Sequence, residues 1–210
     1  MKLKSHSKLT YMIMMLCLLL FVGVAYTIGG NRVTFFDDPI ISYIQAAESP
    51  AWTRVMKWFT AIGSGKVMTI IAMGTLVILF VIFKHRQELI LFCGVVLGSE
   101  FMNIMLKNIF RRARPDLHRL IEIEGYSFPS GHSMVAFSFY GILTYLLWRH
   151  TRPRIARIIL LISSACMILL IGVSRIYLGV HYPSDVIGGY LASSMWLLIC
   201  VIGFERYKKR

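Results

Sequence analysis

The sequence predicts an all-α polytopic membrane protein with six transmembrane helices and an outer amphipathic helical segment. Of its 210 residues, 57% are hydrophobic and 16% are charged, whereas soluble globular chains carry about 45–50% apolar and about 25% charged residues. Six apolar runs approach the length needed to cross a bilayer, about 20 residues, and we expect one membrane-embedded domain over residues 1–210. The runs cover residues 9–28, 67–83, 89–106, 133–148, 155–173 and 186–204.

The first apolar run follows Lys2, Lys4 and Lys8 and has some features of a signal peptide. Its length exceeds the about 7–15 residues of a signal-peptide core, and no clear small-residue cleavage site follows it. We therefore expect this run to be retained as a transmembrane helix.

Residues 31–66 form the longest connection between the apolar runs. Asp38 followed by Pro39 is typical of an N-cap and a first helical position. Residues 52–59 place their large apolar side chains on one helical face. Two interpretations stay open here: a helical pair that lies in the membrane interface, or a simple capping loop.

Positive charge is concentrated on one side of the predicted topology. With the N-terminus in the cytoplasm, the cytoplasmic segments carry 13 of the 23 Lys and Arg residues but only two acids, Glu88 and Glu205. This is the positive-inside pattern, and it places both termini in the cytoplasm. Because the cations are divided among four short segments, we expect no nucleic-acid partner.

The end of the third run carries the first of three polar clusters on the outer side. Lys107, Arg111 and Arg114 are spaced i, i+4 and i+7, which would place them on one helical face. Cations are favoured at a helix C-terminus by the helix dipole alone. Arg and Lys are also the residues that bind phosphate.

The second cluster, Pro129-Ser130-Gly131-His132, precedes the fourth run. Ser130 is a natural N-cap, and Gly131 allows close approach of a ligand to the backbone. A helix N-terminus with free N–H groups can bind an anion. Helix capping alone would explain the same residues.

The third cluster lies between the fifth and sixth runs and contains Ser174-Arg175, His181 and Asp185. A carboxylate that binds a His side chain fixes its tautomer and makes it a better base or nucleophile. An interfacial His beside a helix-capping Asp is the simpler alternative. Because all three clusters fall on the outer side, together they indicate phosphoryl transfer through a covalent intermediate.

The chain resembles the type 2 phosphatidic acid phosphatase family, whose three motifs it matches in full. They read Lys107-x6-Arg114-Pro115, Pro129-Ser130-Gly131-His132 and Ser174-Arg175-x5-His181-x3-Asp185. The resemblance implies a His181 nucleophile, an Asp185 that orients it, and a His132 that protonates the departing alkoxide. It also implies that the phosphoryl oxygens are bound by Lys107, Arg114, Ser130, Gly131 and Arg175. Because these cations and N–H groups can stabilise the transferring group, no metal and no cofactor are expected.

An ionisable residue, Glu100, lies within the third apolar run. Glu100, Asn103 and Lys107 are spaced i, i+3 and i+7 on one face, and an acid within a span normally faces a partner or a cavity. We expect Glu100 and Asn103 to line the floor of the site, with Glu100 positioning Lys107 or Arg111. A helix–helix hydrogen bond without a catalytic role is the alternative.

The resemblance implies an integral membrane lipid phosphatase whose site faces the outside of the cell membrane. The chain most resembles the short bacterial phosphatidylglycerophosphate phosphatases of the Bacillus type, and this resemblance makes phosphatidylglycerol phosphate the first expected substrate. Undecaprenyl diphosphate is the second and phosphatidic acid the third. The expected partners are the lipid substrate and the bilayer, with no obligate protein partner. Two other classes of protein fit this sequence less well, because a transporter would carry polar residues through several spans and a scaffold protein would have a broken motif.

Overall fold

The computed structural model of the protein describes residues 3–29, 34–83, 86–116 and 118–208, and all regular secondary structure within these ranges is helical. Eight helices follow one another in these ranges. They are α1 (Leu3–Gly29), α2 (Thr34–Gln45), α3 (Pro50–Ile62), α4 (Gly65–Phe83), α5 (Arg86–Phe110), α6 (Gly131–His150), α7 (Arg154–Tyr177) and α8 (Pro183–Tyr207).

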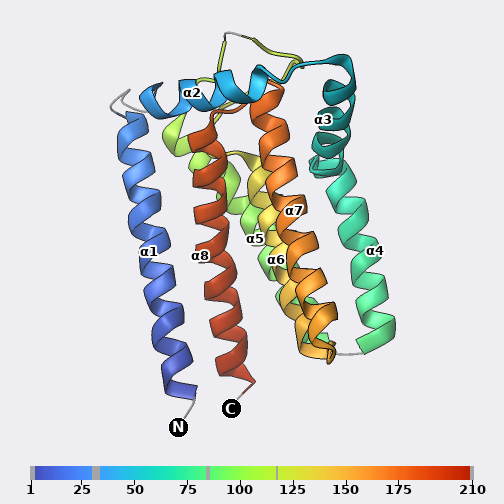
Figure 1. Ribbon diagram of the computed structural model, residues 1–210. Coiled ribbons are helices and arrows are strands. Elements are labelled where there is room, and N and C mark those ends of the chain that lie inside the picture. The colour runs from blue at the N-terminus through green and yellow to red at the C-terminus, as the bar shows by residue number, and fades with distance from the viewer. Residues whose placement is uncertain (1–2, 30–33, 84–85, 117, 209–210) are drawn as a thin grey trace.

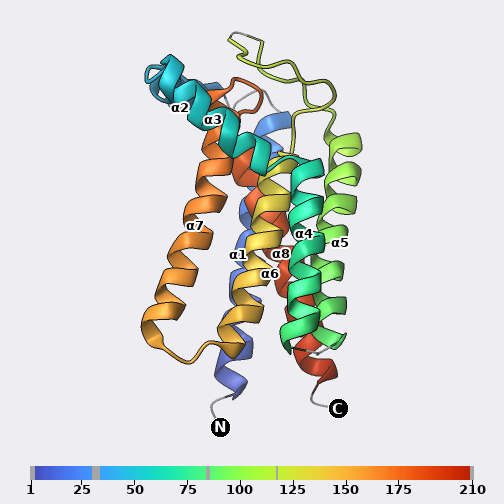
Figure 2. The ribbon, with the colours of Figure 1, turned by 90° about the vertical axis from the view of Figure 1, so that its right-hand side faces the viewer.

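The helices form a bundle that is arranged around α6. This helix packs against α4, α5, α7 and α8, while α1 lies along α8. α2 runs across the bundle at one end and contacts α7 and α8 (Figure 1). α1 begins and α8 ends at the opposite end of the bundle (Figures 1 and 2). The two ends therefore differ: one is covered by α2, and the other holds the outermost turns of α1 and α8.

Four of the described helices are long and apolar enough to cross a membrane, namely α1 from Lys8, α5, α7 and α8. α3 and α4 meet at an angle of 55° and provide a fifth span if the bent pair is one span. Each of the six predicted runs lies within a helix. α6 does not meet the same criteria of length and apolar composition, however, so the prediction of six spans is confirmed only in part. The cause is burial: α6 packs against protein on several sides, and it accommodates small polar residues such as Ser133 and Ser138 there.

Residues 34–62 hold two helices rather than a simple loop. The predicted helix start at Asp38-Pro39 is wrong, because α2 begins at Thr34 and contains Pro39. Asp37, one residue earlier, is fully buried and accepts hydrogen bonds from the start of α8, which holds the first turn of α2 in place. α3 begins as capped helices do, with Ser49 accepting a hydrogen bond from the Trp52 N–H at 3.3 Å.

The end of the bundle opposite α2 is held together by ion pairs. Glu88 of α5 is buried and lies 3.0 Å from His150 and 3.7 Å from Arg149, both at the end of α6. Arg149 also pairs with Glu205 of α8. An apolar core that includes Phe92 and Phe139 connects α5 and α6 above this network. This packing fixes the three helices whose other ends carry the predicted motifs.

Candidate active site

Three segments that are far apart in the sequence meet at the end of the bundle that α2 covers. They are the end of α5 with the loop that follows it, the start of α6, and the turn between α7 and α8 (Figure 2). The loop is attached to the bundle through backbone hydrogen bonds, from Ser127 N–H to Arg112 C=O at 2.8 Å and from Leu120 N–H to Leu178 C=O at 3.1 Å. All three predicted clusters therefore lie at one end of the molecule.

The turn between α7 and α8 presents His181 and depends on Gly179. This glycine has φ +71°, in the left-handed region that glycine adopts without strain. A Cβ atom at this position would lie 1.9 Å from the carbonyl oxygen of His118. The absence of a side chain thus allows the loop before α6 to approach the turn closely.

The two ring nitrogens of His181 face groups of opposite charge. Nδ1 lies 3.3 Å from Oδ2 of Asp185, and Nε2 lies 3.1 Å from Nη1 of Arg114. Because a guanidinium N–H can only donate, Nε2 accepts, and the ring proton is on Nδ1, where it points to Asp185. Burial, together with the positive charges of Arg175 and Arg114, lowers the pKa of His181 to about 3. The imidazole is therefore neutral at neutral pH, with its lone pair on Nε2.

The carboxylate of Asp185 is fully buried and has several further donors. Its Oδ2 accepts hydrogen bonds from the Ser127 hydroxyl and, at 2.9 Å, from the Tyr182 N–H. Its Oδ1 accepts one from Arg112 at 2.6 Å. The sequence motifs assign no role to Ser127 or to Arg112, which is one of the unspecified residues between Lys107 and Arg114. Both contacts depend on the fold of the loop before α6, which no local pattern predicts.

The cations of the first cluster do not share a helical face, so that prediction is wrong. α5 ends at Phe110, and Arg111 has φ +46°, which turns the chain away from the helix axis. Arg111 is exposed and donates to the Asn108 carbonyl oxygen at 3.1 Å. Arg114 instead reaches the site from the loop, where it also donates to the Val180 carbonyl oxygen at 2.9 Å.

Lys107 and Arg175 approach the same region from α5 and α7. Nζ of Lys107 donates to the Tyr126 carbonyl oxygen at 2.7 Å. Arg175 is 1% exposed, and its guanidinium donates to the hydroxyl of Thr60 in α3. Among the described residues nothing accepts a hydrogen bond from its Nε atom. A buried guanidinium with an unused donor is suited to binding an anion.

The start of α6 supplies the second cluster. Ser130 caps the helix by accepting a hydrogen bond from the Ser133 N–H at 3.4 Å, and its own N–H donates to the Asp185 carbonyl oxygen at 3.1 Å. Asn103 of α5 lies beneath this turn, with Nδ2 3.2 Å from the Pro129 carbonyl oxygen. A Cβ atom on Gly131 would lie 2.9 Å from Oδ1 of Asn103, which is too close without a shift. Asn103 thus supports the cap from below.

His132 follows in the first turn of α6. The positive charges of Arg175, Lys107 and Arg114 act on its imidazole, so it shares one electrostatic environment with these predicted site residues. A Cβ atom on Gly63, in the turn between α3 and α4, would lie 3.4 Å from Cδ2 of His132. The bent helix pair therefore closes one side of the site.

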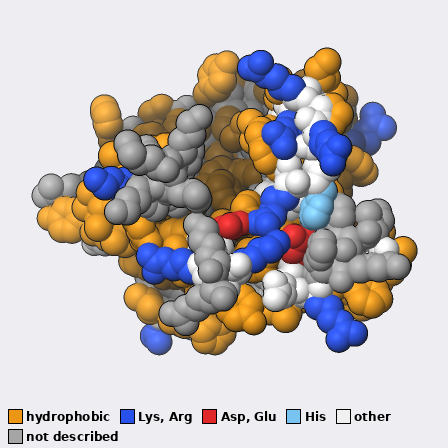
Figure 3. All heavy atoms as spheres, turned by 90° about the horizontal axis from the view of Figure 1, so that it is seen from below, with side chains coloured by type: hydrophobic (Ala, Val, Ile, Leu, Met, Phe, Trp, Pro, Cys, Tyr) orange, Lys and Arg blue, Asp and Glu red, His pale blue; other side chains and the backbone are white. Residues whose placement is uncertain are grey.

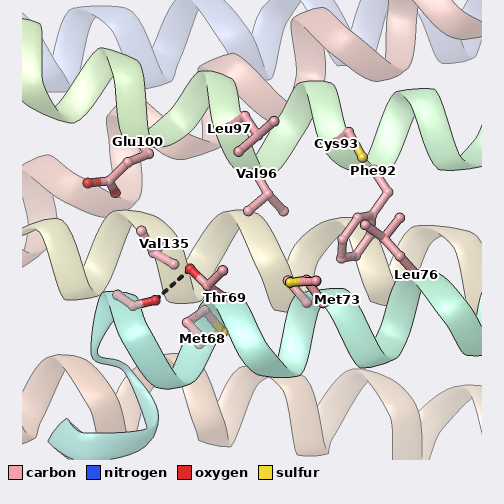
Figure 4. A pocket seen from close by; sticks show the side chains of 12 residues that line it. Met68, Thr69, Met73, Leu76, Phe92, Cys93, Val96, Leu97, Glu100 and Val135 are labelled. Carbon is pink, nitrogen blue, oxygen red and sulfur yellow. Dashed lines mark hydrogen bonds between the residues drawn. The ribbon is translucent and has the colours of Figure 1, made fainter.

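In the described part of the chain Glu100 forms no hydrogen bond or ion pair with the predicted phosphate-binding residues, although its charge and that of Lys107 interact. It lines a cavity of about 280 Å³ between α4, α5 and α6 (Figure 4). The rest of the cavity wall is almost entirely apolar and includes Met73, Phe92 and Leu97. Nζ of Lys107 donates to a backbone carbonyl oxygen, and no ion pair within 4.0 Å joins it to Glu100 in the described structure. The positioning role of Glu100 stays a prediction.

Metal-ligating side chains do not gather in this region or elsewhere in the described ranges. Three or more His, Cys, Asp or Glu residues never come together as a possible metal site in those ranges. The charges that face the His181–Asp185 pair are instead those of arginine and lysine side chains.

Two histidines, a buried carboxylate and three cations at one end of an apolar helical bundle define the class of protein: an integral membrane phosphatase. The chain belongs to the PAP2 superfamily, whose sequence profile matches residues 88–209. It is a phosphoric monoester hydrolase, and the family expected from the motifs is confirmed.

Relatives that match nearly the whole chain and a solved structure agree with this assignment. The chain is 32% identical to phosphatidylglycerophosphatase B of Bacillus subtilis (strain 168), over 91% of this chain and 94% of that protein. It is 27% identical to an undecaprenyl-diphosphatase of Sulfolobus acidocaldarius, over 94% of this chain and 92% of that protein. The crystal structure of a transmembrane PAP2-type phosphatidylglycerolphosphate phosphatase from Bacillus subtilis is similar with a TM-score of 0.84 and 30% identity, covering 94% of this chain and 98% of that one.

Proposed function

We propose that the protein dephosphorylates phosphatidylglycerol phosphate to phosphatidylglycerol through a phosphohistidine intermediate. The observation that carries this proposal is the orientation of His181, whose Nε2 lone pair faces Arg114 while Nδ1–H faces Asp185. A neutral, oriented imidazole beside three cations is suited to attack on a phosphoryl group. The choice of substrate is supported by the similarity to phosphatidylglycerophosphatase B over nearly the whole chain.

The reaction has two steps. In the first, Nε2 of His181 attacks phosphorus, the bond to the lipid oxygen breaks, and the imidazolium form of His132 gives its proton to the departing alkoxide and becomes neutral. Lys107, Arg114 and Arg175 hold the phosphoryl oxygens, with Ser130 and the Gly131 N–H at the helix N-terminus. In the second step, His132 takes a proton from water, the water oxygen attacks phosphorus, and the bond to Nε2 breaks. Phosphate is released and the neutral His181 is restored.

The charge distribution supports an orientation with the site at the outer face of the cell membrane. Among the described side chains, Lys and Arg are spread over the end of the bundle where α1 begins and α8 ends, and Asp and Glu are fewer there (Figure 3). By the positive-inside rule, this end and both termini face the cytoplasm. We include α6 as a sixth, inner span, because it runs between α5 and α7 and carries the predicted general acid at its outer end.

The cavity beside Glu100 supports a lipid substrate. It extends from Gly65 at the start of α4 past Val135 of α6, and Glu100 in its wall precedes Lys107 by about two turns of α5. An apolar cavity in this place can accept part of a lipid whose phosphate is bound by Arg175 and Arg114.

Undecaprenyl diphosphate is the second candidate substrate. The specific observation in its favour is the relative named undecaprenyl-diphosphatase, which matches 94% of this chain. The same nucleophile and cations would serve a diphosphate, with undecaprenyl phosphate as the leaving group. Phosphatidic acid is the third candidate, on the strength of the family motifs alone.

The proposal is tested by measuring phosphate release from these three lipids by the purified protein in detergent with EDTA present. We expect the highest kcat/KM for phosphatidylglycerol phosphate and no loss of activity with EDTA. His181→Ala should abolish release from every substrate. Release that survives in this variant would refute the mechanism, and a preference for undecaprenyl diphosphate would replace the first substrate by the second.

A further inference from the structure

A buried carboxylate outside the PAP2 match is connected to the site. Asp37 of α2 is fully buried, although it precedes the matched residues 88–209. Its Oδ1 accepts a hydrogen bond from the Ser184 N–H at 2.8 Å, and its Oδ2 accepts one from the Ser184 hydroxyl at 2.7 Å. Ser184 lies in the first turn of α8, where N–H groups have no partner within the helix. Asp37 therefore caps α8 from a different helix.

Arg112 links this cap to Asp185. Its Nη2 donates to Oδ2 of Asp37 at 2.9 Å, and its Nη1 donates to Oδ1 of Asp185 at 2.6 Å. The guanidinium also lies over the ring of Tyr182, 3.9 Å from the ring centre. The planar group thus bridges two buried carboxylates from one fixed position.

The bridge determines how Asp185 is presented to His181. With Oδ1 held by Arg112, the carboxyl group cannot rotate freely, and its Oδ2 is directed to Nδ1 of His181 at 3.3 Å. A lysine at position 112 would supply the charge, but it has no planar fork that could bridge two carboxylates with the same geometry. The shape of the arginine is therefore needed as well as its charge.

We propose that Arg112 and Asp37 are positioning residues of the phosphatase: they fix the carboxylate of Asp185 for its action on His181, and they connect α2 to the reaction. The inference rests on the proposed function, in which His181 is the nucleophile. It assigns a role to a helix that lies outside the matched part of the chain.

The experiment compares Arg112→Lys, Arg112→Gln and Asp37→Asn with two matched controls. Arg111→Gln and Asp38→Asn alter the exposed neighbours of the two residues. For each variant, kcat and KM are measured for phosphate release from phosphatidylglycerol phosphate, and phosphohistidine is measured after an alkaline quench. Melting temperatures in detergent report the folded state.

We expect kcat to fall about 100-fold for both Arg112 variants and about 10-fold for Asp37→Asn, because small displacements of a catalytic group have effects of this size. KM should change little, since none of these residues is expected to contact the phosphate. The rate at which phosphohistidine forms should fall in parallel with kcat. The two control variants should have the kcat, KM and phosphohistidine formation of the wild type.

Two results would overturn the proposal: wild-type kcat in Arg112→Lys and Asp37→Asn, or a loss that appears only in KM. If the Arg112 variants do not fold, Asp37→Asn still decides, because asparagine keeps the shape and can still accept from the Ser184 N–H. His181→Ala separates this inference from the proposed function. Activity that survives in His181→Ala would refute both, whereas an inactive His181→Ala with wild-type Arg112 and Asp37 variants would refute only the positioning role.

Discussion

Oδ2 of Asp185 lies 3.3 Å from Nδ1 of His181, and the same oxygen accepts hydrogen bonds from the Ser127 hydroxyl and the Tyr182 N–H. The carboxylate is therefore held by groups from the loop before α6 and from the turn before α8. Such contacts fix the ring orientation and the tautomer of His181 before any substrate binds. The lone pair on Nε2 is a consequence of this arrangement.

Replacement of Asp185 by Asn should nearly abolish the reaction. The amide can turn its NH2 group toward Nδ1, which then becomes an acceptor and moves the ring proton to Nε2. Because Nε2 would lose its lone pair, we expect kcat to fall about 10³–10⁴-fold. An Asp→Asn substitution that stabilises the wrong histidine tautomer has an effect of this size in a catalytic triad. The measurement is phosphate release at saturating substrate. A loss of less than tenfold in a folded variant would show that Asp185 does not set the tautomer.

The neutral state of His181 should also affect the dependence of stability on pH. Folding lowers its pKa from 6.5 to about 3, so between these values the unfolded chain binds a proton that the folded protein does not. The stability of the folded protein therefore falls as the pH decreases from 6.5 toward 3. We expect the melting temperature in detergent to drop more between pH 7 and pH 5 for the wild type than for His181→Asn. Equal drops would contradict the lowered pKa.

The sequence predicts those parts of the site that are close together along the chain. Ser130 and His132 share one helix start, and His181 and Asp185 are separated by a single turn. The partners that hold them are distant: Asp37 lies 147 residues from Ser184. Such contacts arise from the way α2 packs on the bundle, and no local pattern encodes them.

In the fold as well, the features that depend on the local sequence are predictable, and those that depend on tertiary packing are not. Apolar length predicts the position of every long helix, because a helix that faces lipid must be apolar. It does not predict the end of α5 at Phe110, where Arg111 adopts a positive φ. It also does not show that α6 is the most enclosed helix, since burial against protein tolerates small polar residues that lipid would not.

Thr60 should control how tightly the site binds phosphate. Its hydroxyl accepts a hydrogen bond from Arg175, which is almost completely buried. Thr60→Val removes this acceptor and leaves the guanidinium less well oriented, so we expect inorganic phosphate to inhibit about 10-fold less strongly. Thr60→Ser keeps the hydroxyl, so inorganic phosphate should inhibit this variant as strongly as it inhibits the wild type. If the serine variant loses affinity as well, the effect comes from the methyl group and its packing.

Gly131 and Asn103 should behave as a coupled pair. A Cβ atom on Gly131 would lie 2.9 Å from Oδ1 of Asn103, so Gly131→Ala must displace the amide that donates to the Pro129 carbonyl oxygen. We expect Gly131→Ala to lower kcat/KM about 10-fold through this displacement, by analogy with other small shifts of catalytic groups.

In an Asn103→Ala background the same change should have almost no additional effect, because the space for the new methyl group already exists. The double-mutant cycle measures this coupling directly. Equal losses from Gly131→Ala in both backgrounds would contradict it. The methyl group would then act on the other side of the backbone, by keeping the phosphoryl group away from the N–H at the start of α6.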